Sequence, residues 1–108
     1  MSSDYKDLRV WKDAMSLVHD VYRVTLMLPK EEIFGLVSQM RRAAVSVPSN
    51  IAEEKGRHSQ RELAQFLYRS RGSLLELETQ ILIAADLGYI EEVVSATLKS
   101  ISSAWLVP

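Results

Sequence analysis

The sequence predicts an all-α fold, an up-down-up-down antiparallel four-helix bundle. Along four stretches, apolar residues recur at steps of three and four, which is the spacing of one helix face. Short breaks that contain proline or glycine separate these stretches, and none shows the two-residue alternation of a half-buried strand. Because short connections make neighbouring helices antiparallel, we expect one domain over 1–108, with helices at about 7–28, 32–55, 59–87 and 91–105.

The first expected helix carries two apolar stripes, each with helical spacing. The first stripe contains Leu8, Trp11, Met15, Val18, Tyr22 and Thr25. The second stripe contains Val10, Ala14, Leu17, Val21, Val24 and Leu28. Together they make an apolar face wider than one core seam requires, and Pro29 then ends the helix. Excess apolar surface usually marks an interface. We therefore expect a homo-oligomer, with candidate contacts at Tyr5, Leu8, Trp11 and Tyr22.

The second expected helix contains Pro48, which removes a backbone hydrogen bond from a helix interior. Glu31 and Glu32 suit the start of this helix, because carboxylates stabilise a helix N-terminus. Two interpretations are open: a continuous helix that kinks at Pro48, or a break after which Asn50 caps a new helix. The kinked helix is favoured, since the apolar register passes through the proline unshifted.

The third helix has clear signals at both ends. Ser59 and Glu62 form a capping box at its start, and Gly88 suits a C-terminal cap. The fourth helix begins near Glu91, and serines weaken the pattern of its second half.

Pairing the second and third helices about their connecting turn predicts which residues face each other. Ala43 and Ala44 would lie opposite Gly72 and Ser73, and such small residues let two backbones approach closely.

The same pairing brings Arg42 near Glu76 and Asn50 near Gln65. Because Arg42 also shares nearly one helix face with Glu53, we expect a structural polar network. Its candidate members are Arg42, Asn50, Glu53 and Glu76.

Charge is unevenly distributed along a chain whose formal net charge is −1. Residues 36–71 hold seven basic and three acidic side chains, net +4, whereas 72–108 hold one basic and five acidic, net −4. Clustered arginines suit phosphate contact, because each neutralised phosphate releases a counterion. The alternative is that the charges only keep the bundle soluble. The candidate nucleic-acid contacts are Arg41, Arg42, Lys55, Arg57, Arg61, Arg69 and Arg71.

Signals of enzyme chemistry are absent from the sequence. There is no cysteine, and the two histidines, His19 and His58, belong to no Glu-x-x-His pair of the kind that di-metal bundles use. Phosphate-loop, dinucleotide and Gly-x-Ser-x-Gly patterns are also missing. We expect no catalytic residue, cofactor, metal site or small-molecule substrate.

The same sequence gives an expectation for location. No apolar run approaches the roughly 20 residues of a membrane span. The first residues lack the basic and apolar regions of a signal peptide. We expect a cytoplasmic protein without membrane contact.

Four stretches of the chain resemble a known family. They are the segments 7–14, 34–53, 72–80 and 87–90, of which 34–53, FGLVSQMRRAAVSVPSNIAE, is the most diagnostic. These segments are similar to those of the four-helix-bundle proteins encoded in intervening sequences of bacterial 23S ribosomal RNA genes. That family includes the accessory variability determinant of diversity-generating retroelements.

The resemblance implies a homopentameric ring of four-helix bundles and, for the retroelement members, association with RNA or DNA. It implies no catalytic residue. The leading hypothesis is therefore a non-enzymatic oligomer that accompanies nucleic acid or a nucleoprotein. The alternative is an oligomeric scaffold that binds another protein through its helix faces and does not bind nucleic acid.

Overall fold

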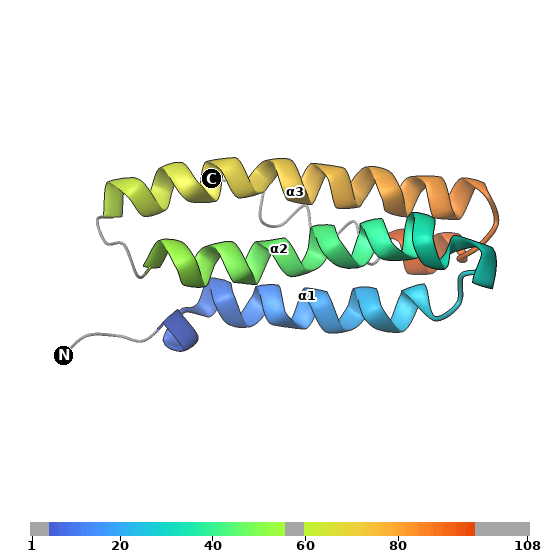
Figure 1. The fold of residues 1–108 in the computed structure, drawn as a ribbon, viewed down its shortest axis with the longest axis horizontal. Helices are drawn as coiled ribbons and strands as arrows, with labels where there is room; N and C mark the ends of the chain where they lie inside the picture. The colour runs from blue at the N-terminus through green and yellow to red at the C-terminus, as the bar shows by residue number, and fades with distance from the viewer. Residues whose placement is uncertain (1–4, 56–59, 97–108) are drawn as a thin grey trace.

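The computed structural model is all-helical, which confirms the fold class (Figure 1). It describes the backbone of residues 5–55 and 60–96, and the side chains of 5–53 and 70–96. Its three long helices are α1 (Arg9–Thr25), α2 (Ser38–Lys55) and α3 (Gln60–Asp86). They lie side by side with α2 in the middle, and successive helices run in opposite directions.

The start of a fourth helix follows α3. Residues 92–96 are helical, and the rest of the helix expected at 91–105 lies outside the described residues. Its direction therefore stays a prediction.

The two apolar stripes of α1 differ in how deeply they are buried. Four members of the second stripe, Ala14, Leu17, Val21 and Val24, are buried in the core. The first stripe is left half-exposed along most of its length, and Tyr22 is 41% exposed. One face of α1 thus closes the core, and the other remains an apolar surface.

The core is continuous along the bundle. It is made of aliphatic side chains from all three helices and of Leu28, Leu36 and Ile90 near one end. The side chains with no exposed surface include Leu17, Met40, Ile51, Leu77 and Ile81. Because α2 packs against both α1 and α3, its side chains fill the centre.

The entry into α2 is irregular, where the sequence predicts regular helix from residue 32. A 3-10 turn, η2 (Lys30–Glu32), leads into a π-helical turn, η3 (Ile33–Val37), and α-helix begins only at Ser38. Inside η3, Gly35 has non-helical angles, φ −109° and ψ −110°. A Cβ atom there would lie 2.8 Å from Glu32 Oε1, so the glycine makes room for this carboxylate.

Glu32 holds this end of the bundle together. Its Oε1 accepts a hydrogen bond from the Leu36 amide at 3.2 Å, which caps η3. Its Oε2 accepts a bond from the Tyr89 hydroxyl at 3.0 Å. Tyr89 follows Gly88, whose φ of +78° ends α3 as the sequence predicts. One carboxylate therefore links the start of α2 to the turn after α3.

Pro48 does not interrupt α2. The helix is continuous from Ser38 to Lys55 with the proline inside it. The interpretation with a break before Asn50 is therefore wrong, whereas the kink at Pro48 stays a prediction.

The expected close approach at Gly72 is wrong. Ala43 and Ala44 are buried, but Gly72 is exposed and an added Cβ would meet nothing within 4 Å. The reason is the register of α3, which turns Leu74 and Leu77 toward the core and Gly72 away from it.

Replacing Gly72 by alanine should stabilise the protein by about 0.5–1 kcal/mol, because glycine loses more backbone entropy inside a helix and nothing obstructs the new methyl group. Urea unfolding measures the change. Gly88→Ala is the contrasting control, and it should destabilise the protein because its φ is positive. A loss of stability in Gly72→Ala would mean that another backbone packs there after all.

The Glu32–Tyr89 bond should make stability depend on alkaline pH. The hydrogen bond to Glu32, partial burial and the negative charges of Glu32 and Glu31 all raise the pKa of Tyr89. The folded protein thus holds the phenol proton more tightly than the unfolded chain. The stabilisation is complete below about pH 10, the ordinary pKa of tyrosine, and is lost as pH rises through the raised pKa.

Thermal melts of the wild type and Tyr89→Phe test this expectation. The variant should melt at a lower temperature near neutral pH, and the difference should shrink above about pH 10. A difference in melting temperature that is the same near neutral pH and above about pH 10 would contradict this expectation.

Candidate nucleic-acid interface and apolar groove

Of the seven basic candidates for phosphate contact, Arg41, Arg42 and Arg71 have described side chains. The other four, Lys55, Arg57, Arg61 and Arg69, have side chains outside the described part. The expected basic cluster around the α2–α3 connection therefore stays a prediction. The three arginines that are described do not share one environment.

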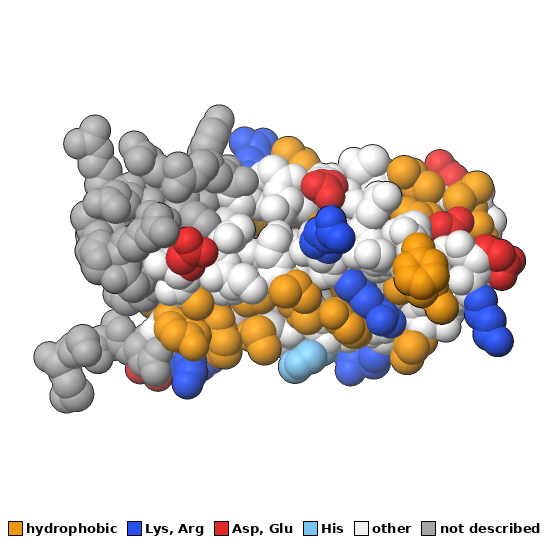
Figure 2. All heavy atoms as spheres, in the orientation of Figure 1, with side chains coloured by type: hydrophobic (Ala, Val, Ile, Leu, Met, Phe, Trp, Pro, Cys, Tyr) orange, Lys and Arg blue, Asp and Glu red, His pale blue; other side chains and the backbone are white. Residues whose placement is uncertain are grey.

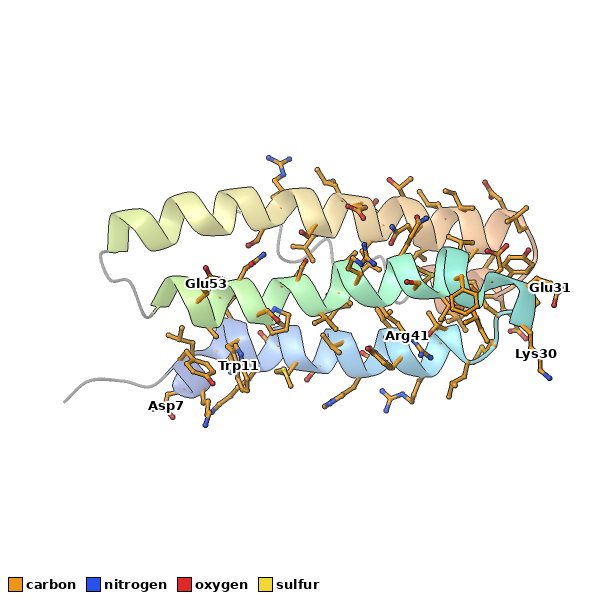
Figure 3. The ribbon with its side chains drawn as sticks, in the orientation of Figure 1. Asp7, Trp11, Lys30, Glu31, Arg41 and Glu53 are labelled. Carbon is orange, nitrogen blue, oxygen red and sulfur yellow. The ribbon has the colours of Figure 1, made fainter. Side chains whose placement is uncertain are left out.

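Arg41 is fixed between α2 and α1. Its Nε donates a hydrogen bond to Thr25 Oγ1 at 2.8 Å, and its Cζ lies 4.4 Å from the centroid of the Tyr22 ring. The Thr25 hydroxyl in turn donates to the Tyr22 carbonyl at 3.0 Å. Figure 3 shows Arg41 reaching from α2 toward α1. A cation–π contact and a hydrogen bond thus hold a half-buried guanidinium in one position.

The guanidinium keeps donors for a ligand. Nε is its hydrogen-bonding atom within the described part of the chain, which leaves the Nη groups of Arg41. From the sequence, Arg41 is predicted only as a phosphate contact, and its packing against α1 is not predicted. The residues that could have indicated this packing are Tyr22 and Thr25 at the end of the first apolar stripe, because a tyrosine ring and a threonine hydroxyl can both bind an arginine.

Arg42 and Arg71 are exposed, on α2 and α3 respectively. Neither forms an ion pair with a described side chain. They are available to a partner, but nothing holds them in position as Arg41 is held.

The expected polar network of Arg42, Asn50, Glu53 and Glu76 stays a prediction. Arg42, Glu53 and Glu76 are exposed and Asn50 is half-buried. Glu76 accepts a hydrogen bond from Gln80 Nε2 on the same helix at 3.2 Å.

An apolar groove of about 370 Å³ runs between α1 and α2 on the outer face of the bundle. One wall comes from the N-terminal turn η1 (Tyr5–Asp7) and from the half-exposed stripe of α1. The other wall comes from α2. The lining residues are Tyr5, Trp11, Met15, Val18, Val45, Pro48, Ser49 and Ala52. Figure 2 shows hydrophobic side chains gathered along this face.

Two of the four candidate interface residues line the groove. Tyr5 and Trp11 meet edge to face, with ring centroids 5.5 Å apart and planes at 70°. Leu8 packs against the core, as Trp11 also does, but it does not line the groove. Tyr22 lies outside the groove, under Arg41.

The sequence pattern does not predict that α2 forms one wall of the groove. Val45, Pro48 and Ala52 have the same helical spacing as the stripe on α1, but they flank the core residues Val47 and Ile51. Only the packing of α2 against α1 shows which of these positions face outward.

No group of three or more histidine, aspartate or glutamate side chains within 5–53 and 70–96 could hold an ion. No helix in the described part of the chain is long and apolar enough to cross a membrane.

A comparison with protein families agrees with this architecture. The family model described as 23S rRNA-intervening sequence protein matches residues 6–104. That range contains all three long helices, both walls of the groove except Tyr5, and all seven basic candidates. No curated protein matches the chain.

The anchoring of Arg41 predicts a stability difference between two adjacent arginines. Arg41→Ala should destabilise the protein by about 1–2 kcal/mol, because it removes the hydrogen bond to Thr25 and the stacking on Tyr22. The matched control is Arg42→Ala, which should stay within about 0.5 kcal/mol of the wild type. Urea unfolding measures the free energy of unfolding of both variants. Equal losses would show that Arg41 does not hold α2 against α1.

Proposed function

Because this chain belongs to the 23S rRNA-intervening sequence protein family, we propose that it is a non-enzymatic, cytoplasmic, homo-oligomeric bundle protein that associates with RNA or DNA. The observation that carries the nucleic-acid part is the fixed guanidinium of Arg41, which lies in a segment of net charge +4. The observation that supports the oligomer is the apolar groove between α1 and α2.

The nucleic-acid interface is proposed to combine the fixed Arg41 with other basic residues of the same segment. Arg41 presents its Nη donors from a fixed position, and a preorganised guanidinium loses little entropy when it meets a phosphate. Arg42 and Arg71 add exposed positive charge. The other candidates are Lys55 at the end of α2, Arg57 in the connection, and Arg61 and Arg69 in α3. Affinity of this kind comes mainly from counterion release and does not require base recognition.

The groove is proposed to be covered by a second copy of the chain. Its Trp11 and Tyr5 rings are large, rigid anchors of the kind that dominate protein interfaces. A pentameric ring, as the family resemblance implies, would repeat the basic segment five times. The potentials of the five basic segments would then add.

A second candidate is an oligomeric scaffold for another protein. It is favoured by the engagement of Arg41 with Tyr22 and Thr25, which gives this arginine a structural use without any phosphate.

A salt titration separates the two candidates. The affinity for a labelled RNA or DNA strand, measured by fluorescence anisotropy, should fall linearly with salt on logarithmic axes. The slope is about −0.9 per phosphate contacted in duplex and about −0.7 in single strands. Arg57→Ala/Arg61→Ala should flatten the slope, whereas Lys30→Ala, an exposed cation at the opposite end, should not. An absence of binding to both single and double strands at low salt would leave the scaffold as the function.

The oligomer is tested by placing a charge in the groove. Trp11→Asp and Val45→Asp should both reduce the mass measured by light scattering to that of one chain, because each would bury an unpaired carboxylate. Val45 is 38% exposed and can be changed with little disturbance of the core. Phe34→Asp, at a residue that is 96% exposed and far from the groove, is the control that should keep the assembly intact. A wild-type protein that has the mass of one chain at every concentration would refute the proposal.

A further inference from the structure

The end of the bundle where α2 begins exposes large apolar side chains. Phe34 is 96% exposed, Leu26 77%, Met27 60%, Leu87 56% and Ile33 50%. These five residues are more exposed than any apolar residue that lines the groove between α1 and α2. Such contiguous apolar surface on a bundle end usually marks a binding site.

Two segments that are distant in sequence form this end. Residues 26–34 lie between α1 and α2, and residues 86–93 comprise the last residue of α3 and the chain that follows it. The hydrogen bond from the Tyr89 hydroxyl to Glu32 joins them at 3.0 Å, and Leu28 and Ile90 are both buried in the core beneath them. Figure 1 shows the two connections at the same end of the molecule. We call residues 26–34 and 86–93 together the acidic–apolar end.

The charge of the acidic–apolar end is strongly negative. It contains five carboxylates, Glu31, Glu32, Asp86, Glu91 and Glu92, and one lysine, Lys30, which gives a net charge of −4. Glu32 is occupied by its bonds to Leu36 and Tyr89. The other four carboxylates are exposed, and none forms an ion pair with a described side chain. In Figure 2 acidic and hydrophobic side chains alternate over this end of the molecule.

Charge decides between the possible occupants of this surface. A nucleic acid would be repelled by the net charge of −4. A second copy docking end to end would bring two such surfaces together, and like charges that face each other across an interface are unfavourable. A partner that carries apolar residues on one side and lysine or arginine around them satisfies both the apolar and the acidic groups.

We propose that the acidic–apolar end binds a cationic amphipathic helix of a partner protein. The apolar face of the partner helix would pack on Phe34 and its exposed neighbours, and its basic residues would meet Glu31, Asp86, Glu91 and Glu92. The molecule measures 47 × 25 × 19 Å, so a helix of about 14 residues, roughly 21 Å long, spans this end. The proposal is independent of nucleic-acid binding, which uses the opposite charge and other residues.

The test uses the whole chain and a defined peptide. The probe is a fluorescein-labelled 14-residue helix of leucine and lysine, with leucine at positions i, i+3, i+4 and i+7 and lysine elsewhere. Its matched control replaces every lysine by glutamate and keeps every leucine. Fluorescence anisotropy should show saturable binding of the cationic peptide that weakens with added salt, and no binding of the anionic one.

Variants place the binding on the acidic–apolar end. Phe34→Ala should weaken the binding of the cationic peptide by at least about fivefold, as expected when an interface anchor is removed. Glu91→Lys/Glu92→Lys should weaken it further. Because all three residues are exposed, these changes leave the core untouched. The controls are Leu75→Ala, which removes a 44% exposed leucine from the middle of α3, and Asp7→Lys, which alters charge at the opposite end. Both should keep the wild-type affinity within about twofold.

Several results would overturn the proposal. They are equal binding of the two peptides, no binding of the cationic peptide, or losses in the two controls that match those in Phe34→Ala. A fall in the mass of the assembly in Phe34→Ala would also overturn it, because the end would then be an interface between copies of this chain.

Discussion

α1 packs beside α2 at one edge of the three long helices and buries one of its faces, although it carries two apolar stripes. The stripe that includes Leu17 and Val21 is buried against α2 and the rest of the core, apart from the half-buried Val10. The other stripe is left over and forms one wall of the groove with Trp11. The hydrophobic effect penalises this exposure by about 25 cal/mol per Å² of apolar surface. A second protein surface that covers the exposed stripe would remove this penalty. The proposed oligomer follows from the excess apolar surface of α1.

The position of α2 is what turns that leftover stripe into a groove. At one end, Glu32 holds the irregular turn η3 and the Tyr89 hydroxyl, which sets where α2 starts relative to α3. Further along, Arg41 ties α2 to α1 through Tyr22 and Thr25. These polar contacts hold α2 beside α1 and next to the turn after α3. The outward residues of α2 then face Trp11 across a narrow space.

The sequence predicts the helices and their buried faces well, because helical periodicity directly reflects burial. The observed ends of α3, Gln60 and Asp86, lie within one residue of the expected 59 and 87. Three features could not be predicted in the same way. Gly35 interrupts the start of α2 because of a contact with Glu32, and no periodic pattern records such a contact.

The other two failures concern pairs of residues on different helices. The assumed register between α2 and α3 put Gly72 at the interface, but the helix rotates it to solvent. Arg41 was grouped with the other basic residues by charge alone, although its partners lie on α1. A single chain shows which side of a helix is apolar. It does not show how far one helix is rotated or shifted against the next.

The bundle also has chemically different surfaces, with an apolar groove on its side and an acidic, apolar end where α2 begins. The central claim is that the groove, with Trp11 in it, is buried between subunits. The most direct measurement is quenching of Trp11 fluorescence by acrylamide in a Trp105→Phe variant, in which Trp11 is the remaining tryptophan. The account predicts strong protection at high protein concentration and a loss of protection on dilution into single chains. Equal, strong quenching at every concentration would contradict it.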